Sequence, residues 1–209
     1  MAAVGAAGIA TSMAQVYSVN AVGYVNKTIP AKGFALISNP LKAATNTINA
    51  VLQPVPAGFQ VYVYTPGKGY AVGTYDDLSG AFLPDAVGNT TITPGQGVFV
   101  QNTGSSAVTI TFVGEVPQGT LTTALVAGLQ IVSSQVPQAG KPSADLGLPG
   151  ADGDQYYVWD STGQKYNVAT YDGLGNAWLP QEYSIDVGDA LFVKKVAAAT
   201  WTRTFNVNG

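Results

Sequence analysis

Two stretches of this chain read almost alike: Gly67-Lys-Gly-Tyr-Ala-Val-Gly-Thr-Tyr-Asp-Asp-Leu-Ser-Gly-Ala-Phe-Leu-Pro84 and Gly163-Gln-Lys-Tyr-Asn-Val-Ala-Thr-Tyr-Asp-Gly-Leu-Gly-Asn-Ala-Trp-Leu-Pro180. Ten of the 18 positions are identical, and the aromatic residue Phe82 is matched by another, Trp178. Agreement of this extent indicates that one unit of the chain has been duplicated.

The similarity extends outward from these stretches in shorter blocks, and the insertions and deletions fall between them, where loops tolerate length changes. The blocks predict two tandem units of about 95 residues, at 16–112 and 113–209. Two copies make a tandem or pseudo-twofold pair, whereas a solenoid needs at least three. The matching blocks are Gly33–Ser38 with Gly128–Ser133, Gln60–Tyr64 with Gln155–Trp159, and Gly95–Val100 with Gly188–Val193.

A last pair of blocks shows the period of a β-strand. In Val108–Phe112 the apolar side chains point to one face and the threonines between them to the other. We align this block with Trp201–Phe205, which sets Arg203 against Ile110. This alignment predicts that the arginine lies at a sheet edge or pairs with an acid.

The composition predicts short strands joined by tight turns. The chain has 209 residues, with 25 Gly and 12 Pro, and only 10% are charged, compared with about 25% in ordinary soluble domains. Each unit offers six or seven candidate strands about ten residues apart. We therefore expect an all-β fold of two tandem pseudo-repeat units, each a β-sandwich or a partly open β-barrel. Large residues on both faces of Gln60–Tyr64 are typical of a strand buried on both sides or of an aromatic-lined surface.

The residue inventory excludes several kinds of site. The chain contains no Cys and no His, which rules out disulfides, thiolate metal sites, Ser-His-Asp hydrolases and histidine-ligated zinc. Its formal net charge is −3, and without a basic cluster it lacks the electrostatic footprint of a nucleic-acid-binding protein. We expect neither enzymatic activity nor a cofactor.

The first 15 residues form an apolar segment that ends close to a small-x-small pattern, Ser12-Met13-Ala14. Such a segment is typical of a signal peptide, and the alternative is an apolar arm that the mature chain retains. It is too short to span a bilayer. Directly after it we predict an arm that pairs with a neighbouring subunit as an added strand, made by Gln15, Val16, Tyr17 and Val19.

Several acidic residues are candidates for chemistry. Asp76 and Asp172 occupy equivalent turn-rich positions, where an aspartate normally accepts hydrogen bonds from its own backbone. We interpret both as turn residues. Asp152 and Asp154 could supply oxygen ligands to calcium, although no EF-hand pattern surrounds them, and the alternative is solvated turn acids.

The aromatic residues of the two copies suggest a ligand surface. Sugar-binding β-modules stack sugar rings on exposed Tyr and Trp, and the alternative for these rings is core packing. We predict one aromatic platform in each unit, made by Tyr70, Tyr75 and Phe82 in the first and by Tyr166, Tyr171 and Trp178 in the second.

Two of the blocks carry a resemblance to a known family. Gly33-Phe-Ala-Leu-Ile-Ser38 and Pro94-Gly-Gln-Gly-Val-Phe-Val100 resemble the Gly-Trp-Asn-Leu-Ile-Ser and Pro-Gly-x-Gly-Tyr-Trp-Val patterns of a repeat module in exported bacterial proteins of the Verrucomicrobia type. In the second copy Val187-Gly-Asp-Ala190 has lost the proline and one glycine. The resemblance covers nearly the whole chain. It implies export and an all-β fold, and it transfers no activity and no functional residues.

These observations predict a secreted, non-enzymatic structural protein that self-associates, as a homo-oligomer or polymer, at the cell surface or in extracellular matrix or filaments. Low charge and abundant strand edges favour this interpretation, because such edges pair readily with another chain. The alternative is a carbohydrate-binding module or adhesin that uses the aromatic platforms, with a polysaccharide as its partner. A function carried by one copy only would be expected where the copies differ, as at Arg203 or between Gly95–Gly97 and Gly188–Ala190.

Overall fold

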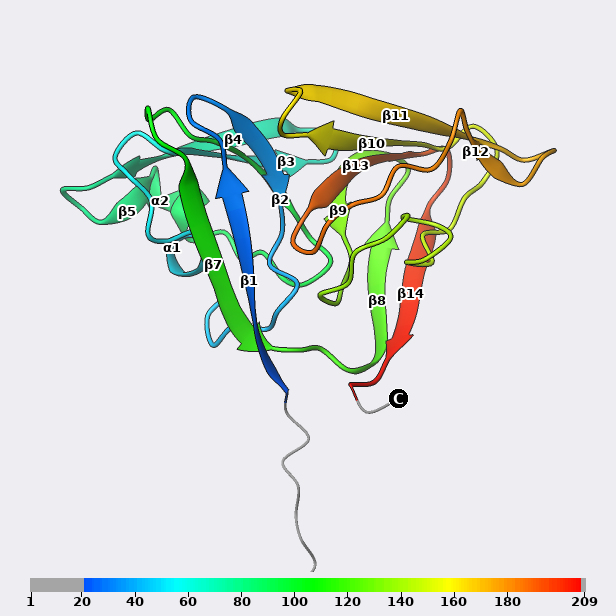
Figure 1. Ribbon diagram of the computed structural model, residues 1–209, viewed down its shortest axis with the longest axis horizontal. Coiled ribbons are helices and arrows are strands. Elements are labelled where there is room, and N and C mark those ends of the chain that lie inside the picture. Colours follow the sequence, from blue (N-terminus) through cyan, green and yellow to red (C-terminus); the bar gives the residue numbers. More distant parts are fainter. Residues whose placement is uncertain (1–20, 208–209) are drawn as a thin grey trace, which may run out of the picture.

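The computed structural model describes residues 21–207, and within them the chain folds into fourteen β-strands and two helices of one turn each. Each unit combines a two-stranded antiparallel ribbon with a five-stranded sheet, and neither sheet closes into a barrel. In Figure 1 the two ribbons run side by side in the lower part of the view, and the larger sheets lie above them. Neither helix is long or apolar enough to cross a membrane. The predicted all-β fold and its duplication are confirmed.

In the first unit the ribbon pairs the first strand with the last, and the sheet has the order β2-β6-β3-β4-β5. The two short helices lie beside β5, and the tight turns between strands fall at the Gly-rich stretches of the sequence. The elements are β1 (Val22–Ile29), β2 (Phe34–Ile37), α1 (Ile48–Val51), β3 (Gln60–Thr65), β4 (Gly69–Asp76), β5 (Ala81–Leu83), α2 (Asp85–Gly88), β6 (Val98–Gln101) and β7 (Val108–Glu115).

The second unit repeats this topology without the helices. Its ribbon pairs β8 with β14, and its sheet has the order β9-β13-β10-β11-β12, which matches the first sheet strand for strand. Because β7 extends to Glu115, the change from one unit to the next falls at residues 116–118 rather than directly after Phe112. The strands are β8 (Gly119–Leu125), β9 (Gly128–Ser133), β10 (Gln155–Asp160), β11 (Lys165–Asp172), β12 (Ala177–Leu179), β13 (Ala190–Lys195) and β14 (Ala199–Phe205).

The alignment of the last strands requires a correction. Lys27 lies opposite Ile110 in the first ribbon, and the equivalent Thr123 lies opposite Trp201 in the second. Trp201 therefore corresponds to Ile110, two residues away from the alignment that the sequence suggested. A shift by two keeps every side chain on its face of the strand, so alternation alone does not detect it. Arg203 donates to Ser134 Oγ at 3.2 Å and to Gln138 Oε1 at 2.6 Å. Both partners are neutral side chains rather than acids.

Each ribbon covers the inner face of its own sheet and forms a separate core there. In the first unit Phe59, Phe82 and Phe112 are fully buried between the two layers. In the second unit Tyr156, Trp178 and Trp201 take the corresponding volume. Aromatic rings bury more apolar area than any other side chains, so they supply a large part of the stabilisation in both cores.

The outer faces of the two five-stranded sheets pack against each other around a pseudo-twofold axis. A third apolar cluster, which includes Leu36 from the first unit and Phe192 from the second, fills this interface. Two backbone hydrogen bonds cross it at equivalent positions, from Ser38 N to Gly188 O at 2.9 Å and from Ser133 N to Gly95 O at 3.0 Å. Gln60–Tyr64 is therefore covered on both sides, with Val61 fully buried and the other side chains partly buried.

The closest approach of the two units is at Gly97 and its equivalent, Ala190. A Cβ added to Gly97 would overlap the Cβ of Ala190 and lie 2.9 Å from Ile131 Cγ2. Gly97 directly precedes β6 and Ala190 begins the equivalent strand β13, so near the axis each residue meets its own counterpart. The second copy can therefore carry Ala190 at this position because the first copy keeps Gly97 opposite it.

Within residues 21–207, the ion pair whose two side chains are both almost fully buried lies in the second unit. Lys195 Nζ contacts Asp154 Oδ2, and both side chains are almost completely shielded from solvent. Lys195 also donates to Pro149 O at 2.9 Å, and Asp154 accepts from Val196 N at 2.8 Å. These bonds satisfy both charges, which would otherwise be very costly to bury.

We predict that Gly97→Ala destabilises the protein by about 1–3 kcal/mol, because the new methyl group overpacks the interface. Combining it with Ala190→Gly makes room for the methyl group and recovers at least half of that loss. Urea denaturation of the two single variants and the double variant measures the effect. The explanation fails if Gly97→Ala is as stable as the wild type, or if the two losses simply add.

For the buried ion pair, we predict that Lys195→Met costs about 3–5 kcal/mol, because it leaves the Asp154 carboxylate without its counter-ion. Asp154→Asn likewise leaves the Lys195 ammonium group buried without its counter-ion. The double variant loses clearly less stability than the sum of the single variants, since it leaves no uncompensated charge. A thermodynamic cycle from urea denaturation gives the coupling, and a coupling near zero would contradict this account.

Candidate functional site

Four of the six residues predicted to form aromatic platforms belong to the cores instead. Phe82 is fully buried against Tyr75, with ring centroids 5.3 Å apart. Trp178 is 5% exposed and packs on Tyr171 at 5.2 Å in the second unit. Phe82 and Trp178 are therefore closed to any ligand, which corrects the prediction for both. The two ring pairs pack in nearly the same way, and this shared packing role explains why the two copies remained alike at these positions.

The other two predicted residues, Tyr70 and Tyr166, lie at the margin of the interface between the units. Tyr70 packs edge-on against Tyr64, and Tyr166 against Trp159, with ring centroids 5.1 and 4.7 Å apart. Burial, with a smaller contribution from Tyr70, raises the pKa of Tyr166 to about 12. Its hydroxyl therefore stays protonated and neutral at physiological pH. Both rings are exposed, at 49% and 39%, as the platform prediction requires, and they also flank an interface that the sequence did not reveal.

The acidic candidates serve local structure. Asp76 Oδ2 accepts a hydrogen bond from Ser79 N at 3.0 Å, and the bonds from Ser79 lower the pKa of this carboxyl group. Asp172 Oδ1 accepts from Leu174 N at 3.0 Å in the equivalent turn. Both side chains hold the first turn after a long strand, as interpreted from the sequence.

The suggested calcium ligands are also engaged within the chain. Asp154 already faces the ammonium group of Lys195, and Asp152 Oδ1 accepts from Gly173 N at 2.9 Å. Within residues 21–207 no group of three or more acidic side chains is placed to hold a metal ion. The predicted intersubunit arm, Gln15 to Val19, lies outside the described residues.

The two units differ where a hairpin of one reaches the other. In the second unit the β10–β11 hairpin is fastened to Phe34 of β2 by three hydrogen bonds, which we call the latch. Trp159 Nε1 donates to Phe34 O at 2.9 Å, Gln164 Nε2 donates to the same oxygen at 3.1 Å, and Phe34 N donates to Gln164 Oε1 at 2.8 Å. The latch closes the hairpin onto the first unit.

The equivalent β3–β4 hairpin of the first unit lacks the latch residues. Tyr64 stands where Trp159 would be, and a phenol has no N–H group to reach the facing backbone. Lys68 replaces Gln164 and cannot accept a hydrogen bond. The loop is also one residue shorter than its counterpart. A pocket of about 500 Å³ lies between this hairpin and β8–β9 of the second unit.

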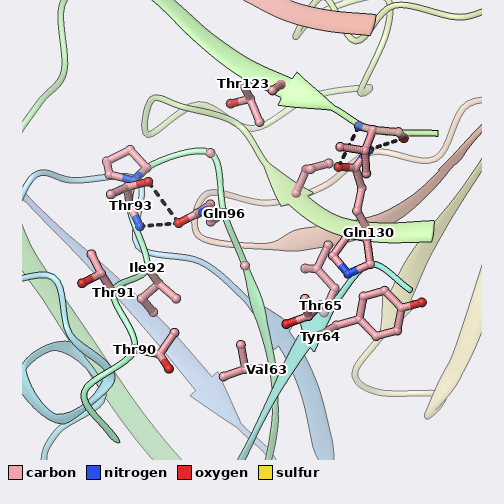
Figure 2. A pocket seen from close by; sticks show the side chains of 18 of the residues that line it. Val63, Tyr64, Thr65, Thr90, Thr91, Ile92, Thr93, Gln96, Thr123 and Gln130 are labelled. Atoms are coloured by element: carbon pink, nitrogen blue, oxygen red, sulfur yellow. Dashed lines mark hydrogen bonds between the residues drawn. The ribbon is translucent and has the colours of Figure 1, made fainter. Parts of the chain in front are cut away.

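The pocket has a neutral, polar wall from each unit (Figure 2). Gln96 lies on the wall of the first unit, and its Oε1 accepts from Thr93 N at 2.9 Å. Gln130 lies on the opposite wall, where it exchanges two hydrogen bonds with the backbone of Val126. No charged side chain occurs among the described residues that line the pocket, which include Thr65, Thr90, Thr91, Thr93, Thr122 and Thr123.

Beside the latched hairpin the chain forms a different hollow. It also measures about 500 Å³, but the residues that line it include Lys32, and within the described part of the chain its lining contains no aromatic ring. On this side Lys27 Nζ forms an ion pair with Asp189 Oδ1 at 2.5 Å. The equivalent positions beside the neutral pocket are Thr123 of the second unit and Gln96 of the first. Burial raises the pKa of Asp189, and Lys27 opposes this shift. The neutral pocket is thus specific to one side of the molecule.

Sequence reasoning did not identify the pocket residues as a group. One signal was present, because Gly95–Gly97 was noted as a point where the copies differ, and this turn lines the pocket. A second signal is that Tyr64 in the first copy corresponds to Trp159 in the second. The consequence of this difference for the pocket can be recognised only once the packing of the two sheets is known.

Comparison with known proteins adds no further constraint on this site. No protein-family model, no curated protein and no solved structure matches the chain.

Proposed function

We propose that this chain is a non-enzymatic structural protein that self-associates through its hairpin tips. The observation that carries the proposal is a pair of leucines at equivalent hairpin tips. Leu78 is 94% exposed in the β4–β5 turn, and Leu174 is 97% exposed in the β11–β12 turn. Figure 1 places these two hairpins at opposite ends of the long axis of the molecule.

Neither leucine is needed by the fold. In the same turns the flanking residues have changed between the copies, from Asp77 to Gly173 and from Ser79 to Gly175. Tyr75 and Asp76 are retained because they pack or cap the turn, but an exposed leucine does neither. A single exposed leucine is ordinary on a protein surface, whereas its retention at both tips supports a contact outside the chain.

The first unit offers an apolar surface for such a tip. On the outer face of the β1–β7 ribbon, Tyr24 lies opposite Val113, with Val22 beside them. These side chains are 74%, 57% and 70% exposed. The same face of the second ribbon is lined mostly by threonines, such as Thr202 opposite Thr122. A tip that binds the Tyr24 surface of the next copy makes a heterologous contact, and such contacts form open filaments unless they close into a ring.

Composition and resemblance support the remaining parts of the proposal. The absence of His and Cys removes the commonest catalytic groups. The low content of charged residues leaves few groups to oppose association between copies. The export that the module resemblance implies would place the assembly at the cell surface or in extracellular matrix.

We predict that the wild-type protein increases in mean mass with concentration, and that the double variant Leu78→Ser, Leu174→Ser stays monomeric. Both leucines are almost fully solvated, so their replacement leaves the stability of the fold nearly unchanged. Size-exclusion chromatography with light scattering measures the masses. Val196→Thr, at another exposed apolar position, is the control and assembles like the wild type. A wild type that remains monomeric at every concentration would contradict the proposal.

The receiving surface is tested by complementation. Tyr24→Ser is expected to prevent assembly on its own, because it removes the main apolar side chain of that surface. Mixing it with the double leucine variant restores contact, since one variant supplies intact tips and the other an intact surface. The expected products are small capped complexes rather than filaments. If the mixture stays monomeric, the tips do not bind this surface.

A further inference from the structure

We infer that the pocket between the β3–β4 hairpin and β8–β9 binds a neutral polyhydroxylated ligand, an oligosaccharide or a segment of polysaccharide. Its volume of about 500 Å³ falls within the usual range of small-molecule sites. It involves none of the leucine tips or the Tyr24 surface, so this inference is independent of the proposed self-association.

The chemistry of the lining selects the class of ligand. Hydroxyl and amide groups both donate and accept hydrogen bonds, as the hydroxyls of a sugar do. An ionic ligand would lose its hydration without gaining a counter-ion here, and that loss is costly. A purely apolar ligand would leave the threonine and glutamine groups without partners. A neutral ligand with many hydroxyl groups meets all of these conditions.

Two of the polar groups are held in place before any ligand arrives. Gln96 Oε1 accepts from both Thr93 N and Thr93 Oγ1, at 2.9 and 3.1 Å, which leaves its amide N–H groups free to donate (Figure 2). Gln130 is 6% exposed and is fixed by Val126. Side chains already fixed in position lose little entropy on binding, which favours affinity.

The pocket also offers an apolar surface for the C–H face of a sugar ring. Tyr64 lines the pocket, and its ring is fixed between Tyr70 and Phe192, with centroids 5.1 and 5.7 Å away. Ile131 completes this side from the second unit. An aromatic ring next to hydroxyl and amide groups therefore arises where the two units meet, and neither unit supplies it alone.

The inference is tested by isothermal titration calorimetry of the full chain with cellohexaose, xylohexaose, maltohexaose, laminarihexaose and mannohexaose. At least one of these is expected to bind. Thr65→Trp fills the pocket from an exposed position and abolishes binding of that sugar. Thr162→Trp adds the same bulk to the tip of the latched hairpin and leaves binding unchanged.

A second variant tests the amide of Gln96 without disturbing its turn. Gln96→Glu still accepts from Thr93, as the carboxylate of Asp189 accepts from Asp186 N at 2.9 Å in the other unit, but it loses the N–H donors. The dissociation constant is expected to rise about five- to tenfold, the effect of one lost hydrogen bond. The inference is wrong if none of the five sugars binds, if Thr65→Trp binds as the wild type does, or if Thr162→Trp blocks binding equally.

Discussion

The packing of two sheet faces across a pseudo-twofold axis is the constraint on which the rest of the structure depends. Each five-stranded sheet has a second apolar face that its own ribbon cannot cover, so one unit alone would expose Tyr62, Phe99 or their equivalents to water. Duplication solves this by providing a matching face in the same chain. Residues near the axis then meet their own counterparts. The space between one such pair is large enough for a glycine facing an alanine but too small for two alanines. The Gly97–Ala190 pair therefore follows from the duplication itself.

Away from the axis the two units were free to diverge, and they did so in their interiors. Asp154 and Lys195 occupy the positions of Phe59 and Asn102. The equivalence is established by matching backbone bonds, from Tyr171 N to Asp154 O and from Tyr75 N to Phe59 O, each 2.8 Å long. An aromatic ring in one copy is thus replaced by a buried ion pair in the other. Such a pair is retained where both charges stay fully bonded, because loss of either partner is costly.

The fold class and the duplication were predictable because they depend on local patterns. Three such patterns occur twice and can be recognised without tertiary information: the Tyr-Asp-x-Leu turns, the alternation of apolar and polar residues in strands, and the glycines in the turns. The register of β14 was not predictable in the same way, because the alternating threonines of Val108–Phe112 still align with threonines after a shift of two residues. The aromatic residues show the same limit. Phe82 and Tyr70 look alike in the sequence, and only the packing of layers makes one a core residue and the other an interface residue.

The candidate site was hidden for a related reason, since it arises from a difference between units rather than from a motif within one. A tryptophan and a glutamine latch one hairpin to the neighbouring sheet, and a tyrosine and a lysine leave the other unlatched. The leucine tips remained alike in both copies. The two hollows differ in their described linings, since the one beside the β3–β4 hairpin is neutral and the one beside the latched hairpin includes Lys32. A symmetric molecule would present two equal surfaces of each kind. The described chain instead combines an exposed leucine tip in each unit with a neutral pocket beside the first hairpin.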